Sequence, residues 1–345
     1  MRKLTVLSVA FPFAIVSTDP IGGAEQILAR IDRTLIEAGH HSIVLAAEGS
    51  ESAGDLITLP RISGEIRQAE WNRAHASVRA AIAGAVRTQN VDLVHLHGVD
   101  FPNYLPTSNI RVLATLHLPL SYYPPDVLDP ARPRTWLNTV STAQTREIRS
   151  HSSIVAMIEN GVAAPHGPTP AKESFALAMG RICPEKGFHL ALDAARAANL
   201  PLKLAGAVGE FPEHRAYFER EIVPRLDADR QWIGPVAGSM KWRLLSAARC
   251  VLVPSLVAET ASLVAREALA AGTPVIAFPS GALSETIEDG YNGFLVDNLD
   301  RMVEALSRTE EIASSACRLT AETKYSAARM SQQYLELYDR LMELD

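Results

Sequence analysis

The sequence lacks several features that define large classes of proteins. Its three cysteines are too few and too widely spaced for a disulfide framework or a cysteine-rich metal site, so they fit reduced thiols in a cytosol: Cys183, Cys250 and Cys317. A formal net charge of -6 offers no basic surface for a nucleic-acid partner. No apolar run reaches the roughly 18 residues of a membrane-spanning helix. These absences favour an ordinary globular protein of the cytoplasm.

The N-terminus has two interpretations. Arg2 and Lys3 precede the apolar run LTVLSVAFPFAIV, which resembles a secretory signal peptide. No small-residue cleavage pattern follows, and Pro12 interrupts the run. We therefore interpret this segment as a buried first strand.

The length of 345 residues predicts two domains, because a single core rarely serves so long a chain. Strand-like and helix-like segments alternate, which is typical of parallel α/β architecture. Residues 160–172 are rich in Gly, Pro and Ala and form the candidate linker. We expect an N-terminal Rossmann-like domain over 1–163, a second over 172–324, and a C-terminal helix over 325–345.

The segment Val251–Val296 contains two glutamates at a predicted strand–loop–helix junction. Val251–Pro254 reads as a buried strand, Glu259 falls in the loop after it, and Glu267 lies more than a turn into the next helix. Free N–H groups and the dipole at a helix start attract anions. Carboxylates beside such an anion site are suited to sugar hydroxyls, so the pattern indicates a nucleotide-sugar site.

Other polar residues follow predicted strands. Gly22 and Gly23 open the first helix and allow backbone N–H groups to approach a phosphate. Arg181 and Lys186 follow the first strand of the second half and could hold a pyrophosphate. Among His95, His97 and His117, the last is the strongest site candidate because the run VLATL leads directly to it.

The pair Asp227 and Asp229 forms a D-x-D pattern, which in some nucleotide-sugar enzymes carries a divalent metal. Here the pair precedes a strand and ends a charged helical stretch, so we interpret it as a solvated helix end. No metal ligand set and no cofactor are therefore expected.

These motifs in this order resemble glycosyltransferase family four, whose members are retaining GT-B enzymes. The resemblance covers nearly the whole chain. The matching segments are GGAE, TLH, ENGV at 159–162, GRICPEKG at 180–187 and ETASLVAREALAAGTPVIA. It implies two Rossmann-like domains facing across a cleft, with the last helix crossing back to the first domain.

The resemblance also implies a role for each matching residue. Glu267 would bind the ribose hydroxyls of the donor, and Glu259 the hydroxyls of its sugar. Arg181 and Lys186 would hold the diphosphate, in a pocket completed by Gly22 and Gly23, and His117 would face the donor sugar. Backbone N–H groups of three consecutive residues would lie nearby: Ala261, Ser262 and Leu263.

The resulting prediction is a metal-independent retaining transferase that moves a hexosyl group from a nucleoside diphosphate sugar, with UDP as the expected nucleotide. The acceptor stays open among a small molecule, a glycan and a lipid, and so does a peripheral membrane contact. The alternatives are a GT-B epimerase or phosphorylase, a two-domain non-enzymatic sugar-binding protein of the periplasm, and a transferase fold without activity.

Overall fold

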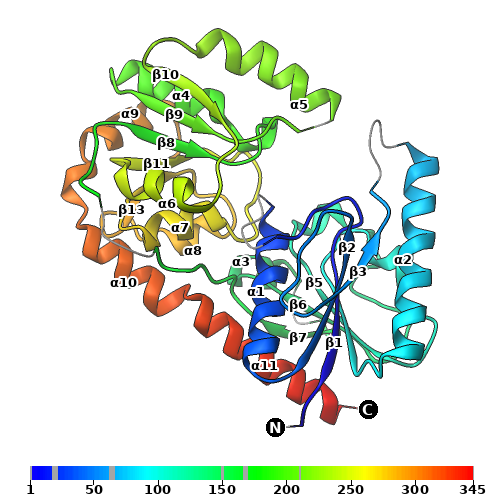
Figure 1. The fold of residues 1–345 in the computed structure, drawn as a ribbon. Coiled ribbons are helices and arrows are strands. Elements are labelled where there is room, and N and C mark those ends of the chain that lie inside the picture. The colour runs from blue at the N-terminus through cyan, green and yellow to red at the C-terminus, as the bar shows by residue number, and fades with distance from the viewer. Residues whose placement is uncertain are drawn as a thin grey trace. The chain divides into compact units, whose positions relative to one another are not determined.

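The computed structural model describes residues 2–17, 22–61, 67–148, 151–165, 170–209 and 211–344. The chain divides into two compact units, which we call unit 1 (residues 1–160 and 327–345) and unit 2 (residues 161–326). Part of the candidate linker and the end of a predicted helix, residues 166–169 and 149–150, lie outside the described residues. Each unit contains a parallel sheet with helices around it, which confirms the predicted α/β class (Figure 1).

Unit 1 is built on a sheet whose described strands lie in the order β3-β2-β1-β4-β5-β6-β7. The strands are β1 (Thr5–Val9), β2 (His41–Ala47), β3 (Asp55–Leu59), β4 (Leu93–Leu96), β5 (Arg111–Thr115), β6 (Thr135–Thr139) and β7 (Ile154–Met157). The helices are α1 (Gly23–Glu37), α2 (Gln68–Thr88), α3 (Thr142–Ile148) and α11 (Ala327–Glu343), with single turns η1 (Phe101–Tyr104) and η2 (Leu120–Tyr122). Strand β1 is paired on both sides and buried, so the first-strand interpretation of the N-terminal run is confirmed.

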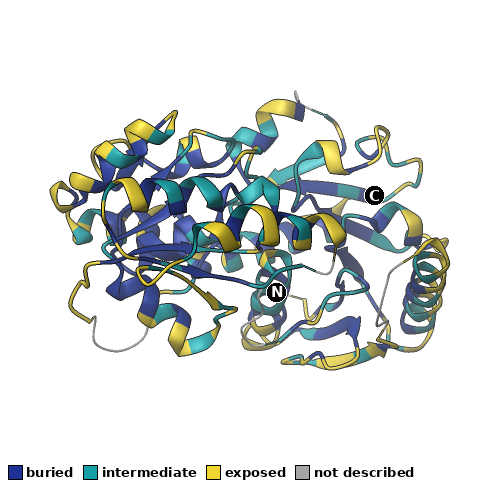
Figure 2. Ribbon diagram, turned by 90° about the horizontal axis from the view of Figure 1, so that it is seen from above, coloured by how far each residue is buried: buried dark blue, intermediate teal, exposed yellow. Residues whose placement is uncertain are grey.

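Successive residues of β2 show how the sheet is covered on both faces. Ile43 and Leu45 belong to the core that includes Val78 of α2, whereas Val44 packs with Leu28 of α1. Side chains of a strand alternate between the two faces of a sheet. Helices α1 and α2 therefore cover opposite faces, and the strands between them are buried (Figure 2).

Helix α11 packs onto unit 1 although it follows unit 2 in the chain. The hydroxyl of Tyr338 bonds to Nδ1 of His95 at 2.7 Å, and the hydroxyl of Tyr334 lies 3.3 Å from the Thr115 hydroxyl. The guanidinium of Arg111 donates to the carbonyl oxygen of Leu341 at 2.9 Å. Both tyrosines are 1% exposed. The predicted return of the last helix to the first domain is thus confirmed, and His95 serves to hold that helix.

Unit 2 has a second parallel sheet, whose described strands lie in the order β10-β9-β8-β11-β12-β13. These strands are β8 (Ala176–Met179), β9 (Leu202–Ala205), β10 (Arg230–Gly234), β11 (Cys250–Val253), β12 (Val275–Ala277) and β13 (Gly293–Leu295). The α-helices are α4 (Phe188–Ala197), α5 (Pro212–Tyr217), α6 (Gly238–Ala247), α7 (Leu263–Ala270), α8 (Leu283–Thr286), α9 (Leu299–Ser307) and α10 (Ser314–Lys324). Shorter turns are η3 (Pro184–Lys186), η4 (Phe218–Ile222), η5 (Val223–Arg225) and η6 (Thr309–Glu311).

The sequence pattern predicts helices over 213–226 and 283–289, and both differ in the structure. The stretch 213–226 is not one helix, because α5 widens into a π-turn over 218–222 and a 3₁₀ turn follows. Pro224 lacks the N–H that would continue an α-helix, which explains the irregular end. Helix α8 ends at Thr286 and not at Asp289, because the Asn292 side-chain amide donates to the carbonyl oxygen of Thr286 at 3.2 Å.

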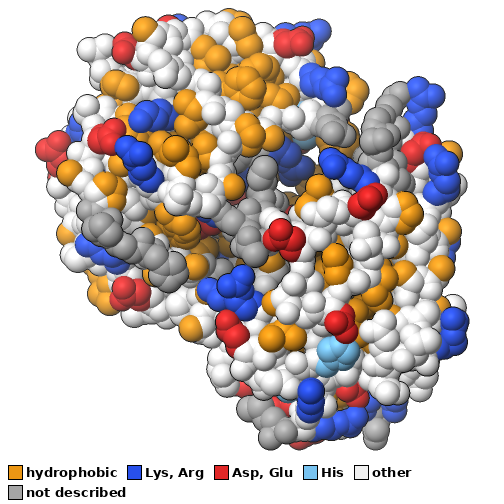
Figure 3. Space-filling model, viewed as in Figure 1, with side chains coloured by type: hydrophobic (Ala, Val, Ile, Leu, Met, Phe, Trp, Pro, Cys, Tyr) orange, Lys and Arg blue, Asp and Glu red, His pale blue; other side chains and the backbone are white. Residues whose placement is uncertain are grey.

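On the face shown in Figure 3, basic and acidic side chains are interspersed among hydrophobic and uncharged groups. In the described ranges, no helix combines the length and the apolar character that crossing a bilayer requires.

Candidate active site

The strand order of unit 2 places a topological switch between β8 and β11. From β8 the chain runs outward through β9 and β10, and it then returns to β11 on the other side of β8. Loops that leave two such strands diverge, and ligands of open α/β sheets bind in the resulting crevice at the carboxyl ends. The loop after β8 carries Arg181 and Lys186, and the loop after β11 carries Glu259. Sequence analysis therefore selected residues from both sides of the switch point.

The two loops are fastened to each other. The backbone N–H of Leu256 donates to the carbonyl oxygen of Glu185 at 2.8 Å. Gly187 has a positive φ of 63°, and a Cβ atom there would overlap the carbonyl oxygen of Pro254. A side chain at this position would therefore force the loops apart. The glycine at the end of the motif GRICPEKG is required by this close approach.

Lys186 and Glu259 form an ion pair across the switch point. Nζ of Lys186 lies 2.6 Å from Oε1 of Glu259, and the Ser255 hydroxyl donates to the same oxygen. The side chain of Glu259 is 10% exposed. Burial raises the pKa of Glu259, but the Lys186 ammonium and the Ser255 hydroxyl outweigh it, and the net pKa lies below its ordinary value. Glu259 is thus a buried, ionised acceptor.

The backbone of Glu259 is held from the other side by the loop after β12. The N–H of Ala282 donates to the carbonyl oxygen of Glu259 at 2.7 Å. Gly281 has φ +58°, and a Cβ atom there would overlap that carbonyl oxygen and lie 2.8 Å from the Glu259 nitrogen. The position of the carboxylate consequently depends on a residue without a side chain.

Gly281→Ala should lower turnover at least tenfold, because the methyl group would displace the backbone of Glu259. The left-handed backbone alone costs about 1–2 kcal/mol for alanine. The matched control is Gly290→Ala, since Gly290 has φ +75° with nothing within 4 Å of the added Cβ atom. Both variants carry the cost of the left-handed backbone, and the overlap with Glu259 adds to it only in Gly281→Ala, so with both proteins folded only Gly281→Ala should lose turnover. Equal turnover in the two variants would contradict the positioning role of Gly281.

Glu267 forms a buried ion pair that sequence analysis missed. Its Oε1 lies 2.9 Å from Nζ of Lys241 on α6, and the two side chains are 4% and 7% exposed. Glu267 is the fifth residue of α7, as its predicted place in the helix requires. Lys241 belongs to no motif, and only its position in the first half of a short amphipathic helix marks it in the sequence. The pair fixes the carboxylate of Glu267 about one turn into the helix that follows the loop carrying Glu259.

The N-terminus of α7 lies beside the same loop. Ser262 precedes the helix with an extended backbone (φ -70°, ψ 93°), and its side chain makes no capping hydrogen bond. The first N–H groups of a helix have no acceptor in the preceding turn. This end of α7 can therefore present the donors predicted at Ala261, Ser262 and Leu263. Arg181, on the other loop, is exposed.

Asp227 and Asp229 take part in different interactions. Asp227 accepts from the Arg230 guanidinium and from the N–H of Asp229 at 3.0 Å, while the Asp229 side chain is 61% exposed. The hydrogen bond from Arg230 contributes most to lowering the pKa of Asp227 to about 2. The pair closes a turn before β10, in agreement with the interpretation as an ordinary surface feature.

In unit 1, the predicted histidine lies at the end of a strand as expected. His117 follows β5 and is 9% exposed, and its Nε2 lies 3.0 Å from Nδ1 of His97, which follows β4. Burial lowers the pKa of His117 to about 3 and that of His97 well below its ordinary value. Both rings are therefore neutral at pH 7, and one donates to the other. The role of His117 toward a donor sugar stays a prediction.

The protein should unfold more easily as the pH falls from 7.5 to 5.5. Burial lowers the folded-state pKa of His95, His97 and His117, so the unfolded chain binds protons that the folded chain does not. The contribution of these three rings to the free energy of unfolding is fully present above pH 6.5. Below pH 6.5 it is lost, by up to about 1.4 kcal/mol per pH unit for each ring. Burial raises the pKa of Asp100, so the contribution of this residue to the free energy of unfolding changes with pH in the opposite direction. Equal urea midpoints at the two pH values would contradict this account.

Gly22 and Gly23 lie at the start of α1, as predicted. Gly22 precedes the helix with φ -78° and ψ 140°, a conformation open to any residue. A Cβ atom at Gly22 would meet only the end of the flexible Glu25 side chain. Gly22 and Gly23 therefore lie at a helix N-terminus, and the backbone conformation of Gly22 does not itself require a glycine.

Solved structures define the class of protein to which this arrangement belongs. A glycosyltransferase involved in avilamycin A biosynthesis superposes with a TM-score of 0.72 at 25% identity, covering 99% of each chain. The Anabaena protein HepE in complex with UDP and glucose superposes with a TM-score of 0.76 at 17% identity, covering 97% of this chain and 99% of that one. Two Rossmann-like units with a switch-point site in the second are those of a GT-B glycosyltransferase.

Family models show which group of GT-B glycosyltransferases the chain resembles. A model described as Glycosyltransferase Family 4 matches residues 21–162, and one described as Glycosyl transferases group 1 matches residues 164–324. The phosphatidyl-myo-inositol mannosyltransferase of Mycolicibacterium smegmatis is 26% identical over 84% of this chain and 81% of its own length. The chain belongs to the glycosyltransferases of the family-four type.

Other curated relatives match over a smaller share of their length. The D-inositol 3-phosphate glycosyltransferase of Nocardioides sp. is 37% identical over 32% of this chain and 25% of its own. The first three curated relatives are each spanned over less than half of their length.

Proposed function

We propose that this glycosyltransferase is a retaining hexosyltransferase that uses a nucleoside diphosphate sugar, with UDP as the nucleotide. The observation that carries the proposal is the Lys186–Glu259 pair, which places a cation and a sugar-hydroxyl acceptor 2.6 Å apart at the switch point of unit 2. The choice of UDP is supported by HepE, a protein of similar fold that binds UDP and glucose.

The basic residues of the loop after β8 would act on the leaving group. When the bond from the sugar C1 to the diphosphate oxygen breaks, negative charge accumulates on that oxygen. Arg181, Lys186 and the N-terminus of α7 offset the charge and so lower the barrier. The acceptor hydroxyl attacks C1 from the same face and passes its proton to the departing diphosphate, so the sugar keeps its anomeric configuration.

The two glutamates divide recognition of the donor. Glu259 accepts hydrogen bonds from hydroxyls of the transferred sugar, for which its ionised state suits it. Glu267 accepts from the ribose hydroxyls of the nucleotide. Each carboxylate is oriented by its own lysine, Lys186 and Lys241 respectively, at 2.6 and 2.9 Å. The proposal therefore assigns sugar and nucleotide to different ion pairs.

We also propose that turnover needs neither a cofactor nor a divalent metal, because side-chain cations take the place of a metal at the diphosphate. A cytoplasmic location is supported by the three cysteines, which are unbridged and buried. The acceptor stays open among a small molecule, a glycan and a lipid.

UDP should raise the melting temperature of the protein. A ligand present at one hundred times its Kd stabilises the folded state by about 2.7 kcal/mol. Differential scanning fluorimetry with UDP, GDP and ADP at millimolar concentration measures this, and uridine without phosphates serves as a control. A larger shift with GDP would change only the assigned base. If none of the diphosphates shifts the transition, the proposed donor site is wrong.

A further inference from the structure

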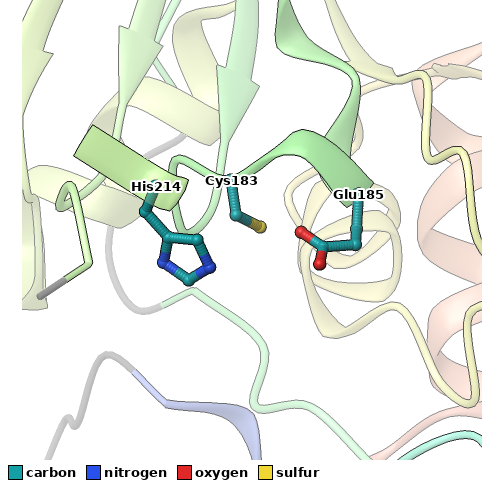
Figure 4. Close-up of side chains that lie close together, drawn as sticks. All are labelled: Cys183, Glu185 and His214. Atoms are coloured by element: carbon teal, nitrogen blue, oxygen red, sulfur yellow. The ribbon is translucent and has the colours of Figure 1, made fainter. Parts of the chain in front are cut away.

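Three potential metal ligands lie together at the carboxyl end of β8. Cys183 and Glu185 come from the loop and turn after that strand, and His214 comes from the first turn of α5 (Figure 4). One donor atom from each residue lies within 4.8 Å of the other two. In Figure 4 the Glu185 carboxylate is directed toward the Cys183 thiol, with the imidazole ring on the other side of the sulfur.

These side chains are largely removed from water. Cys183 is 2% exposed and His214 is 6% exposed. Within the described ranges, Oε2 of Glu185 is buried without a hydrogen-bond partner. Burying polar atoms without partners is costly, so a cluster of this kind is better satisfied with a bound ligand.

The donor set selects the type of ion. A thiolate, an imidazole and a carboxylate together suit Zn²⁺, which prefers sulfur and nitrogen ligands in a tetrahedral arrangement. Zinc–ligand bonds of about 2.0–2.3 Å place tetrahedral donors roughly 3.5 Å apart. The three donor atoms lie within 4.8 Å of one another, near this spacing.

We propose that Cys183, Glu185 and His214 bind one Zn²⁺ ion, with water as the fourth ligand, and that this ion stabilises the loop after β8. Binding displaces the thiol proton of Cys183 to solvent, because the thiolate is the ligand. The ion would link the loop to α5, next to the point where the Glu185 carbonyl accepts from Leu256. Neither Lys186 nor Glu259 contributes a ligand. The inference therefore goes beyond the proposed function and does not depend on it.

Titration of metal-free protein with Co²⁺ and then Zn²⁺ tests the site. The wild type should show a thiolate-to-cobalt charge-transfer band that saturates at one equivalent and disappears when zinc displaces cobalt. Cys183→Ala should lack the band. Cys317→Ala, which removes another fully buried thiol, should retain it. His214→Gln keeps the thiol and should weaken binding at least tenfold.

Absence of the band from the wild type, or equal zinc binding by the wild type and Cys183→Ala, would overturn the proposal. Melting curves of the variants show whether each is folded, and the wild-type spectrum is decisive even if Cys183→Ala is not. The chelated wild type should melt at a lower temperature than the zinc-loaded protein while UDP still raises both melting temperatures. Loss of the UDP response in every state would count against the donor site and not against the zinc site.

Discussion

Replacing Glu259 by glutamine should lower turnover about 10- to 100-fold while the Kd for UDP changes less than about threefold. The carboxylate is paired with Lys186 and is ionised, so the neutral amide removes a charged acceptor from the transferred sugar. Hydrogen bonds to charged groups contribute about 1.5–3 kcal/mol, which corresponds to that range of rates. UDP lacks the sugar, so its affinity should be nearly unaffected.

Glu310→Gln is the matched control for this experiment. The side chain of Glu310 is 86% exposed and pairs only loosely with Arg249 at 3.6 Å, so the same chemical change there should be silent. The rate of donor cleavage measures turnover, and calorimetry with UDP measures the Kd. Unchanged turnover in the Glu259 variant would refute its role at the sugar, and a large loss of UDP affinity would move that role to the nucleotide.

The buried Glu267–Lys241 pair should show the largest effect on stability. Glu267→Gln leaves the Lys241 ammonium buried without its counter-charge, and breaking a buried pair costs about 3–5 kcal/mol. The same variant should weaken UDP binding about tenfold to a hundredfold, because a carboxylate that bridges two ribose hydroxyls is lost. In this single variant, a loss of UDP affinity could come from lost stability or from the lost ribose contact.

A double variant separates the two causes. Lys241→Met combined with Glu267→Gln removes both charges and should recover most of the lost stability, since no unpaired charge remains. UDP affinity should stay reduced, because the ribose acceptor is still absent. Urea unfolding and UDP calorimetry on the wild type, the single variant and the double variant decide the matter. Recovery of both stability and affinity in the double variant would make Glu267 a structural residue only.

The parts of the fold that could be predicted are those with local signals. Strands β8 and β11 are short apolar runs with buried side chains, and the polar residues after them fall at the switch point because β8 and β11 are neighbours in the sheet. Strand β3 was missed because it is an edge strand whose residues Asp55 and Leu56 are exposed, so it has no apolar run. Local pattern therefore located the loops of the site but not every strand, since β6, a largely buried inner strand, was missed as well.

Partners that come from distant segments could not be predicted. Lys241 meets Glu267 because α6 packs beside α7, and His214 meets Cys183 because α5 returns to the carboxyl end of β8. No spacing in the sequence encodes these tertiary contacts. Ser255 is different, since it lies in the same loop as Glu259 and its hydroxyl could have been noticed.

The most direct test of the central claim is the fate of a panel of nucleoside diphosphate sugars followed by proton NMR in the presence of chelator. We expect at least one hexose donor, with UDP as its nucleotide, to be cleaved to the diphosphate and a sugar product whose first-formed anomer matches that of the donor. Glu259→Gln should slow this cleavage and Glu310→Gln should not. If no donor is cleaved or bound, or if the product has the opposite anomeric configuration, the account of a retaining nucleotide-sugar transferase is contradicted.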